Sequence, residues 1–193
     1  MSEAIRIDDR RVWTPADLDE LYAGDGRNDV DWRRFEIVDG ALVVSPPAVP
    51  RHELVVAEMI GALHPAVPAG FHVIAAAGIV MSRSFHVTDV TVLSRRAFDS
   101  NSGLVDPANV LVAVEIESPS SVTMDRVTKP AQCAAAGVPH YWRVETDPLH
   151  LHVYDLHEGV YVEAGSWSSG DRAVVCSPFP FELDIATLLP LPG

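Results

Sequence analysis

Residues 110–117, Val-Leu-Val-Ala-Val-Glu-Ile-Glu, begin with five apolar residues in a row. Such a run is typical of a strand that is buried on both faces of a sheet. The run ends in Glu115 and Glu117, whose side chains a strand would place on one face, roughly 6 to 7 Å apart. Two like charges at that spacing are costly unless a cation compensates them. A metal site is one prediction for this strand end, and a strand that simply runs out into solvent is the other.

Alternating apolar residues predict a β-hairpin before this strand. Residues 34–38 and 41–45 flank Asp39-Gly40, a strong hairpin signal. Glu36 lies on the first strand and either faces solvent or points into a cleft. The apolar spacing over residues 51–63 then predicts a helix with His52 in its first turn, where histidine is either an ordinary surface or cap residue or part of a site.

Three successive strands are predicted over residues 71–74, 78–82 and 87–93. The last of them carries Asp89 within Val-Thr-Asp-Val-Thr-Val-Leu. Aspartate is disfavoured in strands, so Asp89 is a second anomaly beside the acids at the end of the core strand.

A helical stretch is predicted between the turn at Ser118 and Gly137, which fits a helix C-cap. Lys129 lies in this stretch and is followed at once by Pro130. Proline disfavours the α conformation in the residue before it, so the helix is expected to begin or kink at Pro130. Lys129 would then lie at the helix entrance, near the end of the core strand, unless it is a solvated surface lysine.

The rest of the pattern is rich in strands. A short N-terminal helix is expected over residues 13–21, and residues 140–145 and 149–154 alternate as a second hairpin, followed by meander strands to residue 185. His150 and His152 share one face and could chelate a metal, but with no third ligand in register they are interpreted as exposed edge residues. No repeat or linker interrupts the chain, which predicts a single domain over residues 1–193 with an N-terminal helical extension over residues 1–30.

Composition narrows the functional classes. The chain of 193 residues has 48% hydrophobic residues, as an ordinary globular protein has. Because no apolar run reaches the length of a membrane span and the N-terminus has no signal-peptide core, a cytoplasmic protein without membrane contact is expected. Cys133 and Cys176 show no zinc or disulfide spacing, and both are expected to be buried. The net charge of −13 argues against an extended nucleic-acid surface, although a small site supplied with Mg²⁺ could still act on DNA.

The anomalous residues combine into one chemical hypothesis. Carboxylates of Asp89 and Glu115, from adjacent strands, could hold Mg²⁺, a hard cation that prefers oxygen ligands. Lys129 nearby could orient or help to deprotonate an attacking water. Such a constellation is that of a hydrolytic phosphodiesterase.

The same residues resemble those of a known family. The segments that carry the resemblance cover roughly residues 32–190, and their joint order is specific: Phe35-Glu36-Ile37-Val38-Asp39-Gly40, Pro50-Arg51-His52, Thr88-Asp89-Val90, Val112 to Glu117 with Ser118-Pro119-Ser120, Lys129, and Ala136-Gly137-Val138-Pro139-His140-Tyr141-Trp142. In this pattern the chain resembles the Uma-type putative restriction endonucleases of the PD-(D/E)xK nuclease superfamily.

The resemblance implies an α/β fold with a restriction-endonuclease-like core, in which helices flank a central mixed β-sheet, here with a β-rich C-terminal part. It implies a Mg²⁺-dependent endonuclease, with Mn²⁺ as a substitute ion and DNA as the substrate. By position, Asp89 and Glu115 match the metal ligands, Lys129 matches a lysine moved from the strand to the following helix, and Glu36 matches an acid that completes the catalytic set.

Several residues depart from the family pattern. Thr88 replaces a proline, and Glu117 stands where the parent motif has its lysine, so that Glu117 would bind a second metal ion or point outward. His52 is a further candidate site residue. Pro130 could tilt Lys129 away, and Cys133 occupies a position that is usually aromatic.

Two other functional classes compete with the nuclease. A catalytically impaired relative could serve as a binding or regulatory module, for example as a homodimer through its β-rich C-terminal part. A nuclease should show a basic rim around the acids, from Arg33, Arg34, Arg51, Arg83 and Arg126, whereas a binding module should show an acidic or apolar cleft. A Ser-His-Asp hydrolase is set aside because the chain has no Gly-x-Ser-x-Gly elbow.

Overall fold

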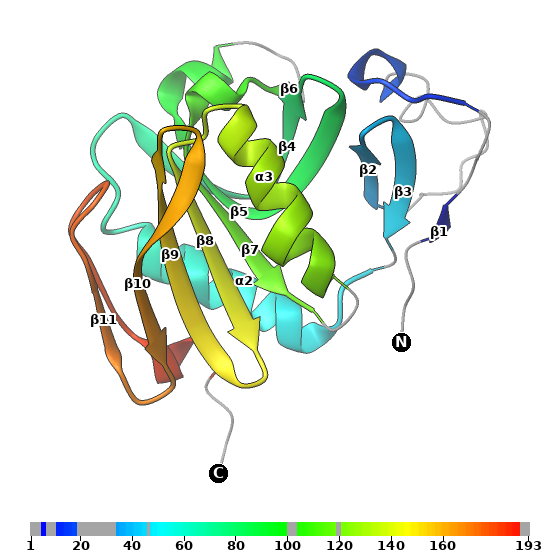
Figure 1. Cartoon of the computed structure of the whole chain (residues 1–193). Coiled ribbons are helices and arrows are strands. Elements are labelled where there is room, and N and C mark those ends of the chain that lie inside the picture. Colours follow the sequence, from blue (N-terminus) through cyan, green and yellow to red (C-terminus); the bar gives the residue numbers. More distant parts are fainter. Residues whose placement is uncertain are drawn as a thin grey trace.

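A central mixed sheet organises the molecule (Figure 1). The computed structural model describes residues 5–6, 11–18, 34–45, 47–99, 104–118 and 121–189. Within them the sheet follows the order β1-β3-β2-β5-β7-β8-β9-β10, with β4 paired to β5 and to β6. Its strands are β1 (Ile5–Arg6), β2 (Arg34–Val38), β3 (Ala41–Ser45), β4 (Phe71–Met81), β5 (Ser84–Ser94), β6 (Leu104–Val105), β7 (Val110–Glu117), β8 (His140–Thr146), β9 (Leu149–His157) and β10 (Val160–Ser168).

The pairing is mixed because β7 and β8 run parallel, as do β4 and β6, while the other neighbours are antiparallel. The parallel pair is joined by the helical segment that crosses the sheet, as a parallel connection requires. A separate two-stranded sheet, β11 (Arg172–Val175) with β12 (Phe181–Asp184), and the 3₁₀ turn η5 (Ile185–Leu188) close the β-rich C-terminal part. The predicted α/β fold with a mixed sheet is confirmed.

Two helical segments cover opposite faces of the sheet (Figure 1). Helix α2 (Pro50–Leu63) packs on the face that carries Val112, Val114 and Ile116, the even positions of β7. Helix α3 (Lys129–Ala135) packs on the odd face, where Ala113 belongs to the second core cluster. Because strand side chains alternate, Glu115 and Glu117 emerge on the α3 side. The apolar run of β7 is therefore buried on both faces, as the sequence indicates.

The helical segment before α3 differs from the expectation. Helical structure does not begin at Pro130: a π-helix, η4 (Met124–Thr128), leads directly into α3, and the Lys129 amide donates to the Met124 carbonyl five residues earlier. A proline inside an α-helix collides with the carbonyl four residues before it. A π turn widens the backbone at that point, so the chain passes Pro130 without a break.

Strand β4 is a second difference. The two strands expected over residues 71–74 and 78–82 form one strand, β4, which pairs with β5 along its whole length. Within it Ala76 has φ +53° and no register partner; the pairing skips from Ala75–Val90 to Ala77–Thr88. This left-handed residue interrupts the alternation of side chains. The sequence predicts two strands because residues 75–77 are alanines, which are depleted in strands.

Other elements follow the sequence with small differences. Hairpin β2–β3 has the predicted bounds, while the N-terminal helix is a 3₁₀ turn, η1 (Pro15–Asp17), behind the expected N-cap Thr14; residues 19–33 lie outside the described residues. Cys133 is buried as expected, but Cys176 is exposed because it follows the edge of the small sheet. Short 3₁₀ turns η2 (Arg95–Phe98) and η3 (Pro107–Asn109) connect β5, β6 and β7. No helix among the described residues is long and apolar enough to cross a bilayer.

Two glycine substitutions test how the hairpin that carries Glu36 is fixed. Gly40 has φ +86°, and a Cβ there would lie 2.7 Å from Val12 Cγ1, whereas a Cβ on Gly61 in α2 would meet nothing within 4 Å. Gly40→Ala is expected to lower the free energy of unfolding by about 1 to 2 kcal/mol. Gly61→Ala should raise it by about 0.5 to 1 kcal/mol. Urea denaturation of both variants measures the difference, and equal effects would contradict the assignment of strain to the Asp39-Gly40 turn.

Candidate active site

A fork in the sheet creates the site. Strand β5 pairs with β7 from Val90 to Leu93, but its earlier part turns to β2, where Phe85 pairs with Ile37. Where β5 leaves β7, backbone amides lose their partners in the ladder. A buried amide needs another acceptor, and in this fork side-chain carboxylates supply it.

Asp89 lies at the branch point. Its Oδ2 accepts a hydrogen bond from the Ile116 amide at 2.9 Å and lies 3.2 Å from His52 Nε2. The side chain is buried. Asp89 is thereby fixed against the residue that follows Glu115, and His52, from the first turn of α2, holds the same carboxylate oxygen from the other side of the sheet.

Glu36 enters the fork from hairpin β2–β3. Its Oε1 accepts from the Val87 amide at 3.0 Å and lies 3.7 Å from Nδ1 of His86, which is fully buried. Of the two orientations open to Glu36, the structure shows the inward one. Both fork acids therefore satisfy backbone groups of the sheet in addition to anything that they bind.

Lys129 brings the helical segment to these acids. Its Nζ lies 3.0 Å from Glu115 Oε2, 3.4 Å from Glu36 Oε1 and 3.5 Å from Asp125 Oδ1. All four side chains are buried. Pro130 does not tilt the lysine away, because the π turn before it aims the side chain at the end of β7. The lysine is thus neither solvated nor on the surface.

Asp125 is a member of the cluster that the sequence analysis missed. Its carboxylate accepts from the Ser121 hydroxyl, and its backbone carbonyl accepts from the Tyr141 hydroxyl at 2.8 Å. Burial raises the pKa of the Asp125 carboxyl above its ordinary value; Lys129 opposes this, and the charges of Asp89 and Glu36 add to it. The sequence feature that could have identified Asp125 is its position four residues before Lys129, on the same helical face.

Four buried carboxylates and one ammonium give this cluster an excess of negative charge, which favours a cation. Among the residues that the structure describes, no three of the His, Cys, Asp or Glu type are placed to hold a metal ion together. The oxygen donors of Asp89 and Glu115 nevertheless suit Mg²⁺, which is commonly bound through one or two carboxylates and otherwise by water and substrate.

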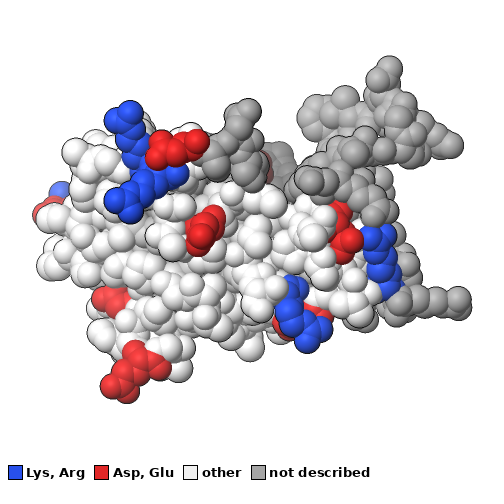
Figure 2. Space-filling view, turned by 90° about the horizontal axis from the view of Figure 1, so that it is seen from above, with Lys and Arg blue, Asp and Glu red and all other residues white. Residues whose placement is uncertain are grey.

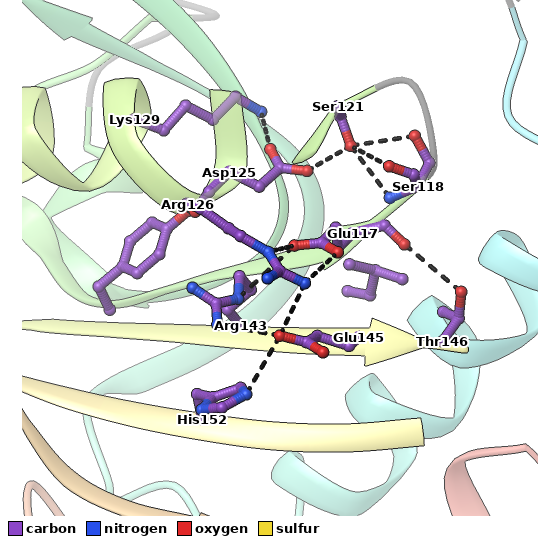
Figure 3. A network of polar contacts seen from close by, with 12 residues as sticks. Glu117, Ser118, Ser121, Asp125, Arg126, Lys129, Arg143, Glu145, Thr146 and His152 are labelled. Carbon is purple, nitrogen blue, oxygen red and sulfur yellow. Dashed lines mark hydrogen bonds and ion pairs between the residues drawn. The ribbon is translucent and has the colours of Figure 1, made fainter. Parts of the chain in front are cut away.

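Glu117 belongs to a second, adjoining network (Figure 3). Glu117 does not point outward: it is buried and forms a bidentate pair with Arg126, with distances of 2.6 and 2.8 Å. Binding of a second metal ion by Glu117 stays a prediction. Arg126 also reaches Glu145, which pairs with Arg143 and with His152. Like charges directly opposite each other in a sheet are destabilising, and Arg126 compensates Glu117 and its register partner Glu145.

His150 and His152 are half-buried rather than edge residues, because β9 lies between β8 and β10. Their rings stack with centroids 4.3 Å apart. His152 lies 3.2 Å from both Glu145 and Glu163. The two histidines therefore extend the network of Glu117 across the sheet.

The expected basic rim is found only in part. Arg51 donates to the Thr146 carbonyl, Arg126 is bound by Glu117 and Glu145, and Arg83 is exposed in the β4–β5 turn. Arg33 and the side chain of Arg34 lie outside the described residues. On the face shown in Figure 2, charged side chains of both signs are dispersed among uncharged ones.

Comparisons with known proteins agree with this architecture. The model of a family described as "Uma2: Putative restriction endonuclease" matches residues 16–188. A crystal structure described as a putative nuclease belonging to DUF820, from Anabaena variabilis, aligns with a TM-score of 0.64 and 16% sequence identity, covering 81% of this chain and 89% of that one. At this identity the likeness concerns the fold. No curated protein matches the chain.

Removal of the Lys129 charge tests whether the ammonium holds the acids together. Lys129→Met should lower the free energy of unfolding by about 3 to 5 kcal/mol, because it leaves buried carboxylates without their cation. Arg172→Met, which breaks the exposed pair with Glu182, should cost less than about 1 kcal/mol. Urea denaturation in EDTA compares the two variants, and similar losses would show that the Lys129 cluster is not a buried ionic centre.

The raised pKa of Asp125 predicts a pH-dependent stability. A carboxyl whose pKa is higher in the folded state contributes stability below its unfolded-state pKa, and this contribution is lost as the pH rises through the folded-state pKa. Asp125→Asn does not titrate. Its stability relative to wild type should therefore increase between about pH 4 and pH 7. Denaturation curves of metal-free protein across this range measure the change; a difference that is independent of pH would refute it.

Proposed function

The chain belongs to the Uma2 family of putative restriction endonucleases, and on this premise we propose that it is a Mg²⁺-dependent endonuclease that hydrolyses phosphodiester bonds in DNA. One observation carries the proposal. Lys129 Nζ lies 3.0 Å from Glu115 in a buried cluster, and Asp89 is hydrogen-bonded to the residue after Glu115. Acids and a lysine that converge from three separate segments are costly to bury, which supports a catalytic purpose.

In this proposal Asp89 and Glu115 hold the metal ion through carboxylate oxygens. Mg²⁺, or Mn²⁺ in its place, supplies Lewis-acid stabilisation of the charge that develops on the phosphate. The protein contributes orientation: His52 and the Ile116 amide fix the Asp89 carboxylate, so that its second oxygen has a defined direction.

Lys129 and Glu36 have the remaining roles. In this proposal the ammonium of Lys129 donates a hydrogen bond to an attacking water beside Glu115. Glu36 and Asp125 position that ammonium through their contacts of 3.4 and 3.5 Å. Because the group is buried, its hydrogen bonds to the reacting atoms are stronger than they would be in water.

A second candidate is a nuclease-fold protein that binds or regulates without turnover. It is favoured by the net charge of −13 and by the engagement of Arg51 and Arg126 with protein acceptors. Both candidates would bind the metal ion, and only the first would hydrolyse DNA. Cytoplasmic location, the single-domain organisation and a homodimer stay predictions.

Cleavage of plasmid DNA with Mg²⁺, Mn²⁺ or EDTA tests the proposal. Wild type is expected to cut in either metal and not in EDTA. Asp89→Asn keeps an oxygen acceptor for the Ile116 amide but removes the charge, and Lys129→Gln removes the ammonium; each should lower the rate at least about 100-fold. Arg172→Gln is the matched control and should cut like wild type.

Metal-independent cleavage, or cleavage that survives both site substitutions, would refute the assignment. No cleavage by wild type, together with Mn²⁺ binding that Asp89→Asn abolishes, would favour the binding module.

A further inference from the structure

Two arginines hold one carboxylate beside the candidate active site (Figure 3). Arg126 Nε and Nη2 lie 2.6 and 2.8 Å from the two oxygens of Glu117, and Arg143 Nε lies 3.7 Å from Oε2 of the same group. The two guanidinium groups come from different elements, η4 and β8. They converge on an anion that the protein itself supplies.

Glu117 and its two arginines each adjoin the acid cluster. Glu117 is two residues beyond Glu115 on the same face of β7, and Arg143 is the register partner of Glu115 in β8. Arg126 follows Asp125 in the π turn that also aims Lys129. A group bound between the two arginines would therefore lie next to the atoms that we assign to hydrolysis.

Glu145 keeps the arginines in place independently of Glu117. One oxygen of Glu145 lies 3.0 Å from Arg126 Nη2 and 3.0 Å from Arg143 Nη2. If the Glu117 carboxylate turned away, both guanidinium groups would still be held. The four side chains together carry no net charge, and the three that remain, Arg126, Arg143 and Glu145, would carry plus one.

The exposure of the two partners permits such an exchange. The Arg126 side chain is 42% exposed, whereas that of Glu117 is 10% exposed. Arg126 is therefore reachable from solvent, whereas Glu117 and the second arginine, Arg143, which is 9% exposed, are buried beside it. Guanidinium groups bind phosphate in the same forked geometry in which they bind carboxylate.

We propose that Glu117 is an internal substitute for a substrate phosphate: it fills a two-arginine phosphate site, and a backbone phosphate of a nucleic-acid strand replaces it when substrate binds. The choice of a nucleic acid rests on the proposed function. The exchange makes binding weaker than two arginines alone would allow, because the phosphate has to displace a bidentate carboxylate. It also explains how a chain with a net charge of −13 offers a local anion site.

The test is binding of a fluorescein-labelled single-stranded oligodeoxynucleotide in EDTA, followed by fluorescence anisotropy. Glu117→Gln keeps an oxygen acceptor for Arg126 but removes the competing charge, and should bind roughly threefold to tenfold more tightly than wild type. Glu182→Gln is the control, since Glu182 also pairs with one arginine, Arg172, which donates to a single oxygen of Glu182 at 3.0 and 2.8 Å in the separate small sheet. It changes the net charge equally and should leave the affinity as it is in wild type.

A double substitution assigns the gain to Arg126. Arg126→Gln in the Glu117→Gln background should abolish the increase and lower the slope of log affinity against log salt by about one. Glu117→Asp, which withdraws the carboxylate by one methylene, should bind with intermediate affinity and serves if Glu117→Gln does not fold.

Equal affinities of Glu117→Gln and Glu182→Gln, no binding by either, or a gain that persists without Arg126 would each overturn the proposal. Because the assay contains no metal and no cleavage, its failure is distinct from failure of the nuclease assignment. Tighter binding without cleavage would leave the phosphate site intact and refute the nuclease. Cleavage by wild type without a specific effect of Glu117 would do the reverse.

Discussion

The contact between the Lys129 ammonium and the Glu115 carboxylate is the interaction on which the rest of the site depends. The carboxylate stands at the end of an apolar core strand, where a charge without a counter-ion would be expensive. The ammonium reaches it because η4 and α3 lie on the odd face of β7 and because the π turn accommodates Pro130. Glu36 and Asp125 lie 3.4 and 3.5 Å from the ammonium. Local backbone geometry, burial and charge are thus linked through one side chain.

The fork between β5 and β7 explains why acids occupy a sheet that is otherwise apolar. Sheet amides that lose their neighbour need acceptors, and Asp89 and Glu36 supply them to Ile116 and Val87. The same two carboxylates retain further oxygen atoms at the cluster. The acids at the branch point therefore satisfy a structural requirement of the sheet at the place where their carboxylates could also serve the proposed chemistry. The family to which the chain belongs is described as a putative restriction endonuclease family.

Local pattern was sufficient to predict much of this arrangement. Strand β7 and hairpin β2–β3 have the predicted bounds, because an apolar run and an Asp-Gly turn are local signals. Residues 71–81 join into one strand because both parts pair with β5 on either side of Ala76, and this tertiary pairing is not visible in the local sequence. The sequence did not predict Asp125 as a site residue, nor the π turn, because the role of each is evident only once the direction of the Lys129 side chain is known. The pairing of Glu117 with Arg126 required knowledge of which helical face covers β7.

The most direct measurement is a crystal structure of the protein grown with Mn²⁺, with anomalous diffraction data to locate the ion. Our account predicts an anomalous peak within bonding distance of carboxylate oxygens of Asp89 and Glu115, and its loss in Asp89→Asn crystals grown in the same way. Crystals of folded protein without a peak at the fork, or with Mn²⁺ bound elsewhere and the Lys129–Glu115 contact unchanged, would contradict the central claim that this buried cluster is a metal-dependent hydrolytic site.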